Sequence, residues 1–89
     1  MQLDKFTDYA LRILVVLAVR SPERLSASAI AKIYDLSDNH LSKVASELVK
    51  CGFVISERGR AGGLTLAMPP ENISVGAVVR ALKSDTPVV

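Results

Sequence analysis

The feature that most constrains this fold is an amphipathic segment at residues 38–50, which follows a short polar turn. Its apolar residues recur at the spacing i, i+3, i+4, i+7 and i+8, which is typical of a helix packed on one face. They are Leu41, Val44, Ala45, Leu48 and Val49. Ser37 is a predicted N-cap, and Gly52 falls where a left-handed residue ends many helices. The sequence therefore predicts a helix from about Asp38 to Lys50.

A shorter helix is predicted immediately before this one. Ser26 is a predicted N-cap, and apolar residues follow it at helical spacing from Ala27 to Tyr34. Asp35 and Leu36 then form the expected turn. Two helices joined by so short a connection favour a helix-turn-helix unit.

A hairpin is predicted after the second of these helices. Residues 53–57 and 64–67 have the composition of strands. The turn between them holds three glycines, Gly59, Gly62 and Gly63. Ser74 is expected to cap a last helix over residues 75–82, with Val75, Val78, Val79 and Leu82 on one side. A helix-turn-helix followed by a hairpin predicts a mainly α fold with a small β-hairpin, the winged helix-turn-helix.

The first helix, expected from Lys5 or Thr7 to Arg20, is apolar on nearly every side. One face carries Phe6, Ala10, Ile13, Leu14 and Leu17. Other faces carry Leu11, Val15, Val16 and Val19. A domain within an 89-residue chain can hardly cover such a helix on more than one side. We therefore expect this helix to pack also against something outside the chain, such as a partner subunit.

Composition allows one small globular domain, expected over residues 1–83, with a loose tail at 84–89. The net charge of +2 is too small to identify a nucleic-acid partner by itself. One cysteine permits no internal disulfide, and we see no signal peptide or membrane span, so a cytoplasmic protein is expected. The sequence shows no zinc-ligand spacing, and Cys51 and His40 lie about three helical turns apart. We therefore expect no enzyme.

The face of the 38–50 helix opposite its apolar stripe is polar and partly basic. At about 100° per residue it carries Asn39, Lys43, Ser46 and Lys50, with Ser42 beside them. Small polar and basic side chains suit a helix that enters the major groove, where the first turns usually reach the bases. We expect Asn39, Ser42 and Lys43 to read bases and Lys50 to contact a phosphate. The alternative is an ordinary solvated helix face.

The glycine turn adds a second basic feature. Arg58 and Arg60 at a hairpin tip can enter a minor groove, and Gly62 and Gly63 would let the backbone approach phosphates. The alternative is an exposed loop with solubilising arginines, and no P-loop signature is present. His40, at the edge of the polar face, is expected to cover the junction with the preceding helix rather than to contact DNA. Cys51 is expected to be a small buried apolar residue.

Three segments together resemble the iron–sulfur winged-helix repressor family that includes NsrR, IscR and RirA. They are residues 5–12 (KFTDYALR), 39–44 (NHLSKV) and 58–63 (RGRAGG). The sequence Asn-His-Leu at residues 39–41 is most similar to the nitric-oxide-sensing NsrR branch. The resemblance implies a homodimer that binds palindromic double-stranded DNA and senses nitric oxide, iron or cluster status. It also implies a cluster held by three cysteines in a loop that follows the position of Val89, and then a dimerisation helix.

The resemblance also assigns residues. Ser37, Asn39, Ser42 and Lys43 match its groove-facing positions, and Arg58 matches its wing arginine. Asp8 matches a position that supplies an oxygen ligand to the cluster in some members. The alternative for Asp8 is a charge favoured near a helix N-terminus. We therefore expect no cofactor in this chain, and an iron–sulfur cluster with Asp8 as a ligand only in a full-length parent; Cys51 matches no ligand.

Two hypotheses for function follow. The first is a sequence-specific DNA-binding transcription repressor that responds to nitric oxide or to an iron–sulfur cluster. The second is a winged-helix module that binds another protein. Gathering of Lys43, Lys50, Arg58 and Arg60 on one surface would favour the first hypothesis, and wide separation of these charges the second.

Overall fold

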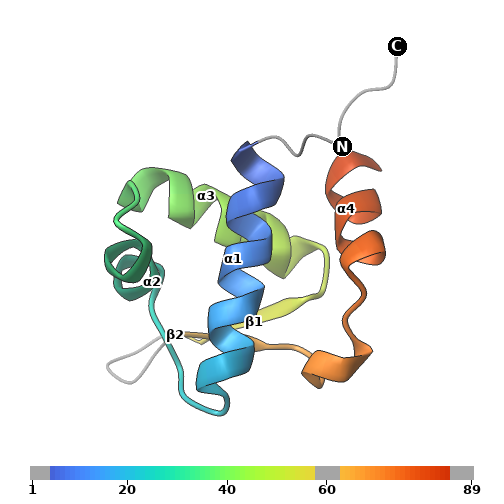
Figure 1. Cartoon of the computed structure of the whole chain (residues 1–89), viewed down its shortest axis with the longest axis horizontal. Coiled ribbons are helices and arrows are strands. Elements are labelled where there is room, and N and C mark those ends of the chain that lie inside the picture. Colours follow the sequence, from blue (N-terminus) through green and yellow to red (C-terminus); the bar gives the residue numbers. More distant parts are fainter. Residues whose placement is uncertain (1–4, 58–62, 85–89) are drawn as a thin grey trace.

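The computed structural model describes residues 5–57 and 63–84, with side chains through residue 82, as four α-helices, a 3₁₀ turn and one antiparallel hairpin (Figure 1). The elements in chain order are α1 (Lys5–Arg20), α2 (Ala27–Tyr34), α3 (Asp38–Lys50), β1 (Val54–Glu57), β2 (Gly63–Leu66), η1 (Pro70–Asn72) and α4 (Val75–Ser84). This order confirms the predicted winged helix-turn-helix. The strands differ from the expected bounds by one residue, and α4 ends at Ser84 rather than Leu82. Of the expected tail at 84–89, Ser84 is instead the last residue of α4, and residues 85–89 lie outside the described residues.

The predicted N-cap serines agree with the structure, and two of the three make a side-chain capping hydrogen bond. The Ser26 hydroxyl accepts a hydrogen bond from the Ala29 N–H at 3.0 Å, and Ser74 does the same for Ala77 at 3.2 Å. Ser37 occupies the predicted N-cap position of α3, although its side chain makes no capping hydrogen bond. Instead, the carboxylate of Asp38 places a negative charge in the first turn, where the helix dipole favours it.

The C-terminus of α3 closes as the sequence predicts. Gly52 has a φ of +87°, a left-handed conformation that glycine adopts without steric cost. Its N–H donates to the Val49 carbonyl at 3.1 Å, and the Phe53 N–H donates to the Leu48 carbonyl at 3.0 Å. This pair of bonds is the Schellman arrangement, which satisfies the last carbonyls of a helix. It also turns the chain directly into β1.

The core is aliphatic and is centred on α1. In Figure 1, α1 crosses in front of α3, with α2 on one side and α4 on the other. The largest fully buried apolar side chains are Ile13, Leu17, Ile30, Leu41, Leu48, Val44 and Val78. Three residues that we expected on buried faces are exposed instead: Phe6, Val49 and Val75. Each lies at the border of its stripe, where the neighbouring helices do not cover it, and Thr7 is buried in place of Phe6.

A short segment before α2 joins the hairpin, which the sequence did not predict. Val54 pairs with Leu66 within the hairpin, and Leu25 forms an isolated antiparallel bridge to Leu64. The Leu25 N–H donates to the Leu64 carbonyl at 3.2 Å, and the Leu64 N–H donates to the Leu25 carbonyl at 2.7 Å. The half of the hairpin nearest its turn is therefore fixed to the segment that leads into α2.

Candidate nucleic-acid interface

The polar face of α3 is presented to solvent because the opposite face is fully engaged. Leu41, Val44, Ala45 and Leu48 are buried against the core. The six predicted site residues of this region are all exposed: Ser37, Asn39, Ser42, Lys43, Ser46 and Lys50. A stripe about 16 Å long runs along the helix and consists of Asn39, Lys43, Ser46 and Lys50, which are spaced by four, three and four residues. Such a stripe has the length and chemistry to follow base edges in a major groove.

Lys50 is a strongly exposed charge of this stripe. Its Nζ lies 3.6 Å from Oε1 of Glu47, and its side chain is 72% exposed. An exposed ion pair at this distance stabilises a fold by about 1 kcal/mol at most, so a phosphate can replace Glu47 as the partner. The geometry is that of a residue able to contact the DNA backbone.

A groove of about 690 Å³ separates α3 from the hairpin. One wall is formed by Ser42, Ser46, Val49 and Lys50 of α3, and another by Ser56, Glu57, Gly63 and Leu64 of the hairpin. Ser26 and Ala27, at the start of α2, close the groove. The helix-turn-helix and the half of the hairpin nearest its turn thus line one concave surface. Arg58, Arg60 and Gly62 lie outside the described residues, so the predicted gathering of four basic side chains stays a prediction.

Gly63 has a packing role that the sequence did not reveal. A Cβ atom at this position would lie 3.1 Å from the Leu25 carbonyl carbon and 3.2 Å from Cβ of Arg24. The absence of a side chain lets the Arg24–Leu25 segment approach the hairpin closely enough for its two hydrogen bonds. The predicted approach of Gly63 to phosphates is a separate role and stays a prediction.

His40 contacts α1 rather than the junction with α2 that we expected. Its ring centroid lies 6.1 Å from that of Tyr9, with the rings tilted by 49°. Tyr9, Lys5 and Phe6 of α1 line a small hollow there, together with His40 and Lys43 of α3. The start of α3 is therefore steadied by α1.

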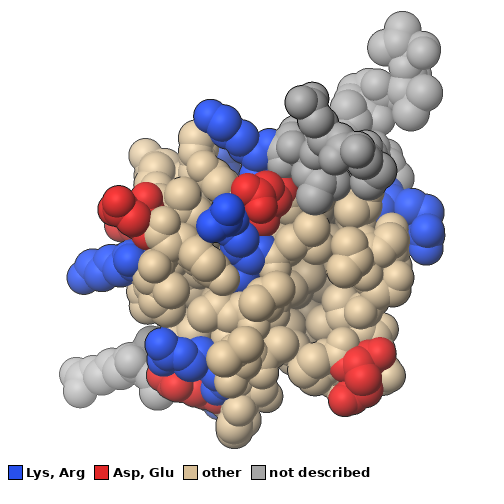
Figure 2. All heavy atoms as spheres, viewed as in Figure 1, with Lys and Arg blue, Asp and Glu red and all other residues tan. Residues whose placement is uncertain are grey.

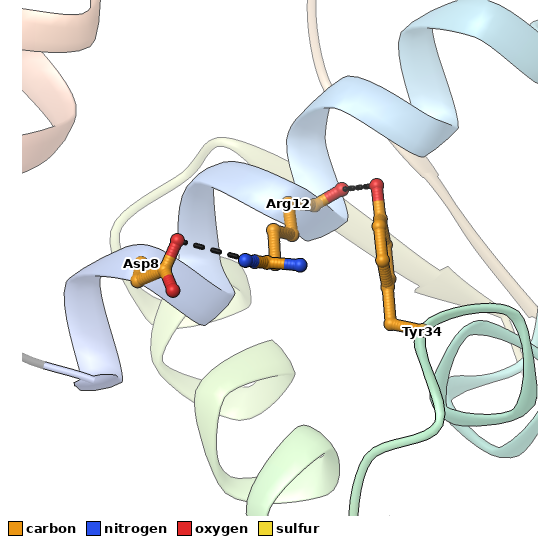
Figure 3. A network of polar contacts seen from close by, with 3 residues as sticks. All are labelled: Asp8, Arg12 and Tyr34. Atoms are coloured by element: carbon orange, nitrogen blue, oxygen red, sulfur yellow. Dashed lines mark hydrogen bonds and ion pairs between the residues drawn. The ribbon is translucent and has the colours of Figure 1, made fainter.

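Asp8 takes part in a network that ties α1 to α2 (Figure 3). Nε of Arg12 lies 3.2 Å from Oδ1 of Asp8, and the Arg12 guanidinium lies 5.4 Å from the centre of the Tyr34 ring. The Tyr34 hydroxyl donates to the Arg12 carbonyl at 3.1 Å. The link from Arg12 to Tyr34 could not be predicted from local patterns, because the two residues are far apart along the chain.

The described residues do not provide a ligand set for an iron–sulfur cluster. Among the described residues, no group of three or more His, Cys, Asp and Glu side chains is placed to hold a metal ion. The sequence has one cysteine, Cys51, which is partly buried and packs against the core. The carboxylate of Asp8 is engaged by Arg12. We therefore derive no cluster chemistry from this chain.

The face formed by α1 and the start of α4 is apolar and exposed. Val15, Val19 and Val75 are 57%, 75% and 62% exposed. Leu11, Val15, Ile73 and Val75 contribute to a groove of about 340 Å³ there. Figure 2 shows few charged side chains on the surface between α1 and α4. Val15 and Val19 are exposed, as the apolar pattern of α1 indicated, whereas Val16 is buried. Packing of this face against a partner stays a prediction. In the part of the chain that is described, no helix is long and apolar enough to span a membrane.

Comparison with protein families gives a match over nearly the whole chain. The family model Rrf2, described as "Iron-dependent Transcriptional regulator", matches residues 3–89. The protein named HTH-type transcriptional regulator NsrR from Bacillus subtilis (strain 168) is 46% identical over 90 residues. Its namesake from Halalkalibacterium halodurans is 44% identical over 90 residues. Each alignment covers 100% of this chain and 62% of the relative, so the chain spans less than two thirds of these relatives.

Solved structures give the same fold. CymR (YrzC), titled the global cysteine regulator of B. subtilis, superimposes with a TM-score of 0.88 at 32% identity, over 100% of this chain and 70% of CymR. IscR of T. potens superimposes with a TM-score of 0.86 at 29% identity, over 100% of this chain and 66% of IscR. Both similarities extend through the helix-turn-helix and the hairpin.

Proposed function

The chain belongs to the Rrf2 family of transcriptional regulators, and from this premise we propose that it is the DNA-binding winged-helix domain of a bacterial transcription repressor. The observation that carries the proposal is the exposed stripe of Asn39, Lys43, Ser46 and Lys50 on α3, beside a groove whose other wall is the hairpin. In this proposal α3 enters the major groove of double-stranded DNA, and the hairpin reaches the adjacent minor groove. Asn39, Ser42 and Lys43 read bases, and Lys50 contacts a phosphate. As a regulator of bacterial DNA, the protein would act in the cytoplasm.

The residue roles are tested by a pair of substitutions. Asn39→Ala is expected to weaken the free energy of binding by about 1–3 kcal/mol on a duplex that the protein has selected from a random pool. On a scrambled version of that duplex the loss should be small. Lys50→Ala is expected to weaken both duplexes about equally, because phosphates carry no sequence information. Fluorescence anisotropy on the two duplexes measures both effects.

Arg80→Ala is the matched control for the loss of a basic side chain. Arg80 is exposed on α4, which packs against α1 rather than forming a wall of the groove. This control should leave both affinities nearly unchanged. If Asn39→Ala and Lys50→Ala alter the selected and scrambled duplexes in the same way, the assigned roles are wrong. Selection of no duplex at all by the wild-type protein would favour the alternative of a protein-binding module.

We further propose that the full-length protein is a homodimer, with the apolar α1–α4 face covered by chain that continues beyond this domain. Its support is the exposure of Val15, Val19 and Val75, together with the greater length of the relatives. In that full-length form the protein would respond to nitric oxide or to an iron–sulfur cluster. This follows from the relatives named NsrR and the family description, and the cluster's cysteine ligands would lie outside this chain.

The dimer proposal predicts a dependence on chain length. The 89-residue chain should self-associate weakly or aggregate, and the longer protein should be a firm dimer that binds half-sites about one or two helical turns apart. Light scattering on both lengths checks this. Val15→Ser with Val19→Ser should reduce association of the short chain, whereas Ile55→Ser, an equally apolar exposed position on β1, should not. A strictly monomeric longer protein would contradict the proposal.

A further inference from the structure

Glu57 is the one acidic residue among the described residues that line the groove between α3 and the hairpin. It ends β1, directly before the segment where Arg58 begins the predicted wing. The opposite wall carries Lys50 and the hydroxyls of Ser42 and Ser46. A carboxylate in a groove that faces DNA is unfavourable, because it repels phosphates. The position of Glu57 in this groove therefore requires a physical explanation.

The partner of Glu57 is Arg24, which lies beside β2 at the end of the hairpin nearest its turn. Nη1 of Arg24 lies 3.0 Å from Oε2 of Glu57, and both side chains are 44% exposed. The hydrogen bonds between Leu25 and Leu64 hold the Arg24 backbone in place, and the missing side chain of Gly63 leaves room for it. The ion pair is thus built by the backbone arrangement and is not a chance meeting of two long side chains.

DNA docked through α3 brings phosphates to this pair. The two sugar–phosphate backbones of a DNA duplex border its major groove. One backbone must therefore pass between a helix that lies in that groove and a hairpin that reaches the next minor groove. In this molecule the space between α3 and the hairpin is the groove that Glu57 lines. Glu57 and Arg24 therefore lie within about a Debye length of the nearest phosphates, where unit charges still interact at physiological salt.

We propose that the Arg24–Glu57 pair sets the affinity of this domain for the DNA backbone, with Glu57 limiting that affinity and Arg24 neutralising Glu57. The proposal rests on the DNA-binding function proposed above. An exposed ion pair contributes little to folding stability, so the pair acts mainly through its charges. Since phosphates are alike in every sequence, the effect falls equally on selected and random DNA.

The two partners are therefore predicted to have opposite effects, although either substitution breaks the same ion pair. Glu57→Gln should tighten binding about threefold to tenfold, because it removes a repulsive charge near the phosphates. Arg24→Gln should weaken binding by a similar factor, because it leaves Glu57 unneutralised. The double variant should return close to wild type. Anisotropy titrations with the selected duplex and with its scrambled version should show the same factors, which shrink as salt is raised.

Glu71→Gln is the matched control. Glu71 loses the same charge and is exposed on η1, a segment that does not line the groove. It should change DNA affinity less than twofold. A role of the Arg24–Glu57 pair in structure alone predicts instead that both substitutions weaken binding and lower the Tm together, and that result would overturn the inference. Binding of no duplex by the wild-type protein would overturn the proposed function and the inference together, whereas equal-sign effects on a protein that binds DNA would overturn the inference only.

Discussion

The affinity of this protein for duplex DNA is expected to fall on the order of 1000-fold or more between about 50 and about 200 mM salt. Each basic side chain that neutralises a phosphate releases condensed counterions, and the entropy of that release is lost as salt rises. Lys50 is exposed on α3, and Arg58 and Arg60 are predicted for the hairpin tip. A dimer would carry two copies of these three basic residues and would therefore make about six contacts with phosphates. Six contacts give a slope of about −5 in a plot of log K against log salt concentration.

Anisotropy titrations at a series of salt concentrations measure this slope. Arg58→Ala and Arg60→Ala should each reduce its magnitude by about one per subunit if the hairpin tip contacts phosphates. Arg80→Ala should leave it unchanged. An affinity that does not change between low and moderate salt would contradict an electrostatic interface and, with it, the placement of the basic residues.

The sequence predicted those parts of the fold that depend on local patterns. Helix periods and caps were enough to place α2 and α3 at their observed bounds, because Ser26 and Gly52 are local signals that do not depend on the rest of the chain. The polar stripe on α3 followed from the same periodicity, since a helix with a fully apolar face must present the other face to solvent.

The sequence did not predict the contacts that join distant segments. The bridge between Leu25 and Leu64 involves single residues, for which no alternating pattern can form. The pairs Arg24–Glu57 and Arg12–Tyr34 join residues that only the folded chain brings together. These contacts position the candidate site. They fix the hairpin to the segment that leads into α2 and hold α2 against α1.

The borders of the apolar stripes were the other source of error. A spacing of i, i+3, i+4, i+7 and i+8 assigns Val49 to the same face as Leu41, but the neighbouring elements cover only part of that face. Val49 is 38% exposed and lines the groove, whereas Leu41 is fully buried. How wide a stripe is covered depends on the neighbouring helices, which periodicity cannot reveal.

The difference between these two residues gives a direct test of the core. Leu41 lies on the first buried turn of α3 and belongs to the core cluster that includes Ile13 of α1 and Ile30 of α2. Truncation at such a site removes apolar contacts and leaves a cavity that surrounding helices refill only in part. Leu41→Ala is therefore expected to lower the free energy of unfolding by about 2–5 kcal/mol. A small domain has only about 5–15 kcal/mol in total, so the substitution should leave a measurable unfolded population.

Val49→Ala is the matched control, because the sequence pattern assigns it to the same stripe while the structure leaves its side chain partly in water. This substitution is expected to lower the free energy of unfolding by about 1 kcal/mol or less, because it removes little buried apolar surface. Urea denaturation followed by circular dichroism gives both values, with an unchanged m-value as the sign that the unfolded states are comparable. If the two substitutions cost the same, the stripe is buried to its full width and α3 sits deeper against its neighbours than described. A large loss of unfolding free energy for Leu41→Ala, with a small loss for Val49→Ala, would instead show that the inner face of α3 is held by α1 and α2. The border of that face, where Val49 lines the groove, would then stay open to a ligand.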